Sequence, residues 1–325
     1  MAIAGGLKYI RGFDRLGVDD VASVGGKNAS LGELYSELRP SGIPVPGGFA
    51  VTADAYRYVL TAANAWDALH EQLDGIDAAD LDDFARRAAK ARAIVASCAI
   101  PADLQREIID AYGALEEQYG PSLSVAVRSS ATAEDLPTAS FAGQHESFLN
   151  VAGADAVLEA YVRCISSLFL ERAIHYRIDC GFDHFRVALS VGVMKMVRSD
   201  LAAAGVAFTL DTESGFRDVV LIDAAYGLAE NVVQGNVDPD QFYVFKPALQ
   251  SGYRKVLSRR IGSKALKLVF LQPEAAGSGT RNVATPDEDR RRACLPDEDV
   301  VKIAGYAVAV EQHYSARAGH PVPMD

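Results

Sequence analysis

The sequence contains little cysteine, and the few cysteines are scattered. Cys98, Cys164, Cys180 and Cys294 are the only four among 325 residues, and no two of them have a C-x-x-C spacing. A disulfide framework needs dense cysteines, and a structural zinc site needs closely spaced Cys or His ligands. The sequence therefore predicts neither, and it indicates a protein of a reducing compartment.

Long apolar runs are also missing. The first residues, MAIAGGLKYIRGF, lack the apolar core of a signal peptide, and no run approaches the ~20 residues of a membrane span. Positive charge is not in excess, since 43 acidic and 32 basic residues give a formal net charge of −11. This balance argues against nonspecific nucleic-acid binding. We therefore expect a soluble cytoplasmic protein with no nucleic-acid or membrane partner.

Hydrophobic residues make up 49% of the chain, and its 325 residues are enough for two or three packed units. From 53 to 120, Ile, Leu and Phe recur at helical spacing, with turn-like breaks at Asp74-Gly75 and at Ile100-Pro101. This spacing predicts a mostly helical region. The acidic residues within it are expected to be solvated or to cap helices, because no glycine turn gathers them as a calcium loop does; they are Asp77, Asp80, Asp82 and Asp83.

A further amphipathic helix is predicted from 154 to 179, with His175 and His184 near its end. We interpret both histidines as helix-end or surface residues and not as catalytic bases.

The most informative stretch runs from Ser124 to Val151. It begins with a short apolar strand pattern that ends at Arg128, followed by Ser129, Ser130 and Thr132, which we expect in a loop. Farther on, Gly143 lets a backbone come close to a ligand because it has no side chain. A guanidinium, several hydroxyls and such a glycine suit a phosphate-bearing ligand. A polar loop between two core strands explains the same residues equally well.

A family resemblance favours the phosphate interpretation. Arg128-Ser129-Ser130-Ala131-Thr132-Ala133-Glu134-Asp135-Leu136-Pro137, with Ser140-Phe141-Ala142-Gly143-Gln144, resembles the signature of the phosphoenolpyruvate synthase and pyruvate phosphate dikinase family. The similarity extends from about Gly25 to the end of the chain. It implies an α+β, ATP-grasp-like, two-lobed nucleotide-binding domain with a helical insertion. The first lobe would span 1–190, including the helical region 53–120, and the second 191–325.

The resemblance also assigns phosphate-binding residues. Gly25 and Gly26 stand before a helical pattern and predict a glycine turn at a helix N-terminus, which is a place that can bind an anion. This is not a Walker A loop, because Val21 replaces its first glycine and Asn28 follows the lysine. By itself, Lys27 is more often a solvated lysine at a helix start. The family motif implies that Lys27 and Arg128 contact ATP phosphates and carry the catalytic charge neutralisation. Gly143 and Ser147 are implied to lie beside the same phosphates.

Two further segments are implied to bind the nucleotide. The apolar pattern from 187 to 197 predicts a strand, and in the family a comparable strand presents its backbone to the adenine edge. Met194, Lys195 and Met196 are then adenosine contacts, although a plain core strand fits the same pattern. A second motif places Glu230 and Gln234 toward the nucleotide or in support of other groups.

The resemblance implies ATP and Mg2+ as cofactors and the conversion of ATP, pyruvate and water to phosphoenolpyruvate, AMP and phosphate, a step of gluconeogenesis. The family's metal ligands are expected just beyond Asp325. Its phosphohistidine and pyruvate-binding domains are absent from this sequence, so we expect the chain alone to be inactive. The full-length family protein is compatible with a homodimer. Two alternatives stay open: the ATP domain of a rifampin-type antibiotic phosphotransferase, and a non-catalytic nucleotide-binding or interaction module.

Overall fold

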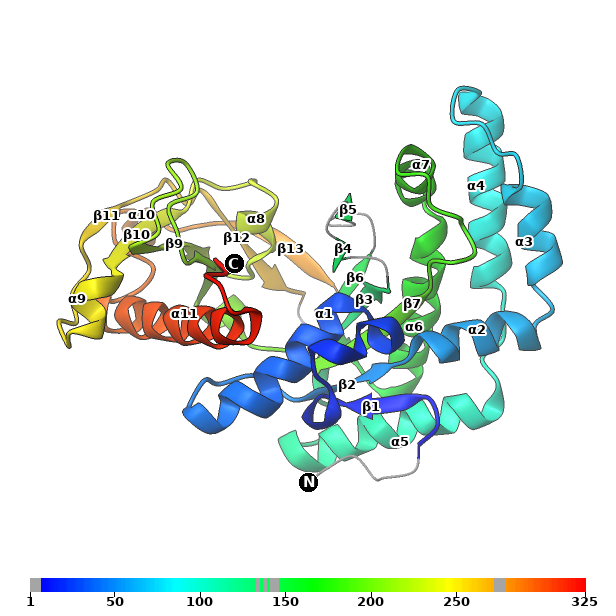
Figure 1. Ribbon diagram of the computed structural model, residues 1–325, viewed down its shortest axis with the longest axis horizontal. Helices are drawn as coiled ribbons and strands as arrows, with labels where there is room; N and C mark the ends of the chain where they lie inside the picture. The colour runs from blue at the N-terminus through cyan, green and yellow to red at the C-terminus, as the bar shows by residue number, and fades with distance from the viewer. Residues whose placement is uncertain (1–6, 133–134, 137–138, 141–145, 272–278) are drawn as a thin grey trace. The chain divides into compact units, whose positions relative to one another are not determined.

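The computed structural model describes residues 7–132, 135–136, 139–140, 146–271 and 279–325, which form two compact units (Figure 1). The first unit is Met1–Met196 and the second is Val197–Asp325. The sequence placed a boundary at 190/191, but the strand that ends at Lys195 belongs wholly to the sheet of the first unit. Both units combine helices with antiparallel sheets.

The first unit is built on a five-stranded sheet of order β1-β2-β7-β3-β6 in which all neighbours are antiparallel. Its strands are β1 (Ile10–Gly12), β2 (Gly48–Val51), β3 (Ser124–Ala131), β6 (Ser147–Ala152) and β7 (Leu189–Lys195). A separate short pair consists of β4 (Asp135–Leu136) and β5 (Ala139–Ser140).

The two faces of this sheet differ. Residues paired across an antiparallel ladder point to the same face, and successive residues of a strand alternate between faces. Arg128 pairs with Gly192 on β7, so both lie on one face, while Val127 and Val193 lie on the other. The face of Val127 is buried in the main apolar core. The face of Arg128 carries a smaller cluster that includes Phe13 and Met194.

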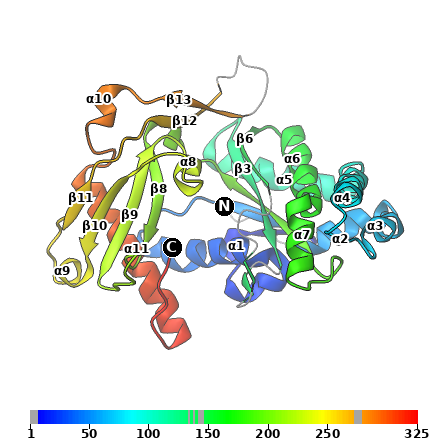
Figure 2. The ribbon, with the colours of Figure 1, turned by 90° about the horizontal axis from the view of Figure 1, so that it is seen from above.

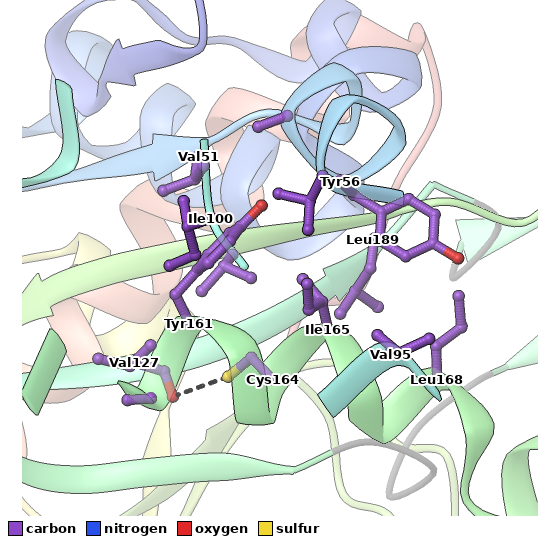
Figure 3. Packing of buried hydrophobic residues seen from close by; sticks show 14 of the residues in the cluster. Val51, Tyr56, Val95, Ile100, Val127, Tyr161, Cys164, Ile165, Leu168 and Leu189 are labelled. Atoms are coloured by element: carbon purple, nitrogen blue, oxygen red, sulfur yellow. Dashed lines mark hydrogen bonds between the residues drawn. The ribbon is translucent and has the colours of Figure 1, made fainter. Parts of the chain in front are cut away.

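Figure 3 shows the main core from close by. Tyr161, Cys164 and Ile165, from one helix, belong to the same cluster as Val127 and Leu189 of the sheet. The thiol of Cys164 donates a hydrogen bond to the Val127 carbonyl over 3.6 Å, and burial raises the pKa of this thiol. All four cysteines are free thiols.

Helices cover the sheet of the first unit and extend away from it (Figure 1). They are α1 (Val21–Glu33), α2 (Ala53–Ala62), α3 (Trp66–Leu73), α4 (Leu81–Ala96), α5 (Ala102–Tyr119), α6 (Ala154–Ser166) and α7 (Glu171–Asp179). The helical region predicted from 53 to 120 is confirmed, with both expected breaks and a further break at 63–65 that the sequence did not predict. Asp80 caps α4 by accepting a hydrogen bond from the Asp83 N–H at 3.1 Å.

The prediction of a single helix from 154 to 179 is wrong. A 3-10 turn, Ser167–Phe169, separates α6 from α7, and Leu170 has an extended backbone. The interruption places a carbonyl where a buried cation needs it, because the Leu168 carbonyl accepts a hydrogen bond from Arg177 at 2.7 Å. A tertiary hydrogen bond between Arg177 and Leu168 is thus made where the sequence pattern predicts an uninterrupted helix.

The second unit has a four-stranded antiparallel sheet of order β11-β10-β9-β8. The strands are β8 (Ala203–Phe208), β9 (Val219–Tyr226), β10 (Asp240–Phe245) and β11 (Ser258–Arg260), and a separate pair is formed by β12 (Leu266–Phe270) and β13 (Thr280–Ala284). The helices are α8 (Glu230–Val233), α9 (Lys246–Gln250), α10 (Asp287–Arg290) and α11 (Asp297–Ala318).

Figure 2 shows β8 to β11 side by side with α11 along one face of the sheet. Val300, Ala304 and Val308 of α11 pack there against Ile222 and Phe242. Within the described residues, no helix is both long enough and apolar enough to cross a membrane.

A buried ion pair ties several loops of the second unit together. Lys264 and Asp240 are both fully buried and in direct contact. The two oxygens of Asp240 also accept hydrogen bonds from the backbone N–H groups of Gly262 at 2.8 Å and Cys294 at 2.7 Å. A buried carboxylate with this many donors is fully satisfied, so the pair fixes where these segments meet.

Candidate functional site

Helix α1 is kinked at Gly25. Gly25 has φ +73° and ψ 163° inside the helical span, so a new helical run begins at Gly26 and places Lys27 in its first turn. A Cβ atom at Gly25 would lie 2.3 Å from Ser130 Oγ and 2.5 Å from the Ser130 carbonyl oxygen. Only glycine combines this backbone conformation with such a close approach. The predicted glycine turn before a helix is confirmed.

The prediction of a loop at Ser129 and Ser130 is wrong. Strand β3 continues through both serines to Ala131, which pairs with Leu189. Both serine side chains are buried and find partners: Ser129 Oγ donates to the Glu146 carbonyl at 3.1 Å, and Ser130 Oγ accepts the Asn28 N–H at 3.3 Å. Because their polar atoms are satisfied inside the fold, the serines can remain in a buried strand.

A small pocket opens on the Arg128 face of the sheet, where α1 lies against β3 and β7. It is lined by Phe13, Lys27, Asn28, Leu31, Arg128, Ser129, Gly192 and Met194. Two cations and three apolar side chains therefore share one pocket. Cations of this kind bind phosphate oxygens, and apolar side chains such as Met194 pack on flat apolar groups.

Three residues named from the sequence thus come together: Lys27, Arg128 and Met194. Phe13 and Leu31, which line the same pocket, were missed by the sequence reasoning. Leu31 could have been found, since it lies one helical turn after Lys27 on the same motif. Phe13 precedes the recognised motifs, and no local pattern marks it.

The backbone of the predicted adenine-binding segment is already engaged. The Lys195 N–H donates to the Gly47 carbonyl at 3.0 Å, and the Met196 N–H donates to the Ser124 carbonyl at 2.9 Å. The ammonium of Lys195 lies 4.4 Å from the centre of the Tyr119 ring. Recognition of a base by these two N–H groups would have to break those hydrogen bonds, so the adenine role stays a prediction.

The remaining predicted residues occupy different places. Ser147 lies on β6 directly across from Arg128 and is exposed. Glu230 and Gln234 lie in the second unit, where Gln234 Nε2 donates to Glu230 Oε1 at 2.9 Å on the exposed surface of α8. Gly143 lies outside the described residues. The nucleotide roles of these four residues stay predictions.

His175 and His184 lie outside the pocket. His175 pairs with Asp179 at 2.9 Å in an exposed helix-end position, as expected. His184 accepts a hydrogen bond from Arg177 Nε at 3.0 Å, and burial together with the Arg177 charge lowers the pKa of His184 to about 4. Burial also lowers the pKa of Arg177 to about 10. A neutral His184 is therefore a structural acceptor.

The sequence comparison defines the class of this protein. Residues 21–325 match the family described as pyruvate phosphate dikinase, AMP/ATP-binding domain. The chain belongs to this family, and the match includes both the Lys27 turn and the Arg128 strand.

Particular relatives are named phosphoenolpyruvate synthase. The chain is 49% identical to the one from Synechocystis sp. over 319 residues, which cover 96% of this chain and 39% of the relative. It is 50% identical to the one from Pseudomonas aeruginosa, with 98% and 40% covered, and 45% identical to the one from Escherichia coli, with 96% and 39% covered. The chain thus spans about two fifths of the length of these relatives.

Proposed function

We propose that this chain binds ATP as the nucleotide-binding part of a phosphoenolpyruvate synthase. One observation carries the proposal: Lys27 and Arg128, which come from elements about a hundred residues apart in sequence, line one pocket together with Met194. Membership in an AMP/ATP-binding family and the names of the relatives support the same function.

In this proposal the chain supplies positive charge to the phosphates. Phosphoryl transfer depends on orientation and on neutralising the charge of the moving group. Lys27 projects a compact ammonium from the first turn of a helix, and Arg128 adds a planar forked donor from a rigid strand. The phosphoryl group would pass to a histidine outside this sequence and then to pyruvate, giving phosphoenolpyruvate, AMP and phosphate.

The proposal includes an ATP-grasp-like fold for the domain and a nucleotide-binding role for Glu230 and Gln234. Mg2+ would neutralise phosphate charge when bound. Among the described residues, no three His, Cys, Asp or Glu side chains gather closely enough to hold a metal ion. Within the described ranges, the side chains therefore do not fit a magnesium site.

Titration of the chain with ATP tests the proposal. Lys27→Ala and Arg128→Ala should each raise the Kd for ATP by about tenfold or more, because a charge-assisted hydrogen bond to phosphate is lost. Arg106→Ala is the matched control, since it removes a cation from an exposed position on α5. Equal affinity in wild type and both pocket variants would contradict the site, and absence of ATP binding by the wild type would contradict the function.

A further inference from the structure

Asn28 occupies a buried position between α1 and the sheet. Its side chain is 2% exposed, and it lines the pocket next to Lys27. Its partners come from strands more than a hundred residues away in sequence. A buried amide costs free energy unless it is hydrogen-bonded, so its partners indicate what the residue holds in place.

The side chain of Asn28 is bound to β7. Asn28 Nδ2 donates to Ser190 Oγ at 3.1 Å, and Ser190 Oγ donates to the Val51 carbonyl on β2 at 2.7 Å. A hydroxyl has one proton to donate. Because Ser190 gives that proton to Val51, it can only accept from Asn28, which fixes the orientation of the amide.

The backbone of Asn28 is bound to β3. With Gly25 as the residue before the new helical run, Asn28 is its third residue, a position whose N–H has no intrahelical partner in a regular helix. A capping side chain normally accepts such an N–H, but glycine has none. Ser130 Oγ, which accepts the Asn28 N–H at 3.3 Å, supplies the cap from the neighbouring strand.

The same amide faces the strand position paired with Arg128. A Cβ atom at Gly192 would lie 2.2 Å from Asn28 Oδ1, and Gly192 is the ladder partner of Arg128. Asn28 therefore fixes the position of the start of the helical run relative to Arg128.

We propose that Asn28 is a positioning residue for Lys27: through Ser190 and Ser130 it fixes the helix turn that aims the lysine at the ATP phosphates beside Arg128. This inference rests on the proposed function and adds to it the residue that determines the lysine geometry. Asn28 touches the sheet and acts on the nucleotide through its neighbour. A lysine on an unfixed turn would lose affinity because it must be ordered on binding.

A double-mutant cycle on the 325-residue chain tests the proposal. ATP is titrated into wild type, Asn28→Ala, Lys27→Ala and the double variant, and folding is checked by thermal melting. Asn28→Ala should raise the Kd for ATP about tenfold, which corresponds to ~1.4 kcal/mol. In the Lys27→Ala background the same change should have almost no effect, because its consequence passes through the lysine.

Two further variants separate positioning from stability. Ser190→Ala removes the acceptor of the Asn28 amide and should weaken ATP binding in the same non-additive way. Tyr112→Phe removes a buried hydroxyl that donates to the Leu123 carbonyl at 2.6 Å, and it should lower the melting temperature with unchanged affinity.

The outcomes are distinct. If Lys27→Ala weakens binding while Asn28→Ala and Ser190→Ala do not, or if their effects add to that of Lys27→Ala, the positioning role is wrong and the ATP site stands. If wild type does not bind ATP, the proposed function fails and this inference with it.

Discussion

Gly192 lies directly across from Arg128 in the ladder between β7 and β3, and its missing side chain leaves the space that Asn28 fills. The relationship makes a strand glycine part of the site geometry. A strand usually loses stability through glycine, so a close approach of another element is the physical reason for one here.

Gly192→Ala should therefore weaken both the fold and the site. The new methyl group would lie 2.2 Å from Asn28 Oδ1, and relieving such overpacking typically costs about 1–3 kcal/mol. Chemical denaturation and ATP titration measure the two effects. Gly113→Ala is the matched control: a Cβ there meets no atom within 4 Å, and alanine in the interior of α5 should slightly stabilise the chain. Equal stability of the Gly192 variant and wild type would show that α1 does not pack closely against β7 at Gly192.

Arg128→Lys should not restore ATP binding. Lysine keeps the positive charge, but its compact ammonium cannot make the paired, planar hydrogen bonds of a guanidinium. The Kd of Arg128→Lys for ATP should remain within about threefold of the Kd of Arg128→Ala. A tenfold change in Kd corresponds to ~1.4 kcal/mol. Wild-type affinity in the lysine variant would mean that Arg128 contributes only charge.

His184 should make the first unit sensitive to acid. Its folded-state pKa, about 4, lies below its ordinary value of 6.5, so the folded chain resists protonation that the unfolded chain accepts. The stabilising contribution is therefore complete above about pH 6.5 and is lost as the pH falls toward 4.

Melting temperatures measured across this range test the sign. His184→Gln keeps a hydrogen-bond acceptor for Arg177 without a titrating ring, so its melting temperature should fall less between pH 6.5 and 4. His175→Gln, at an exposed position, should follow the wild type. A pH dependence unchanged by His184→Gln would remove the histidine from this role.

The buried pair of Asp240 and Lys264 should dominate the stability of the second unit. Asp240→Ala leaves a fully buried ammonium without its carboxylate, which typically costs about 3–5 kcal/mol. Asp54→Ala, which breaks an exposed pair with Arg57, should cost under ~1 kcal/mol. Urea denaturation of both variants makes the comparison, and similar midpoints would contradict the structural importance of the buried pair.

The 325-residue chain by itself should form no phosphoenolpyruvate from ATP and pyruvate. The proposed reaction needs an acceptor histidine that the sequence reasoning placed in a separate domain, and phosphoryl transfer cannot proceed without an acceptor. A coupled assay for phosphoenolpyruvate measures this directly. Product formed by the purified chain would show that the phosphoryl carrier lies within these residues.

The sequence by itself determined the local elements of this protein. Helical spacing predicted the region from 53 to 120, the glycines before Lys27 predicted a turn, and the apolar run ending near Val197 predicted a strand. The motif around Arg128 was enough to indicate the family. These features depend on neighbours within a few residues, which is the range that periodicity and turn chemistry report.

The tertiary structure alone decided which polar atoms are used. Ser129 and Ser130 look like loop residues, yet partners elsewhere in the chain let them continue a buried strand. The N–H groups of Lys195 and Met196 look available in sequence, yet they donate to Gly47 and Ser124. Asn28 is bound to residues 102 and 162 positions away. A local pattern cannot specify such partners, because burial satisfies each polar atom with whatever the fold brings beside it.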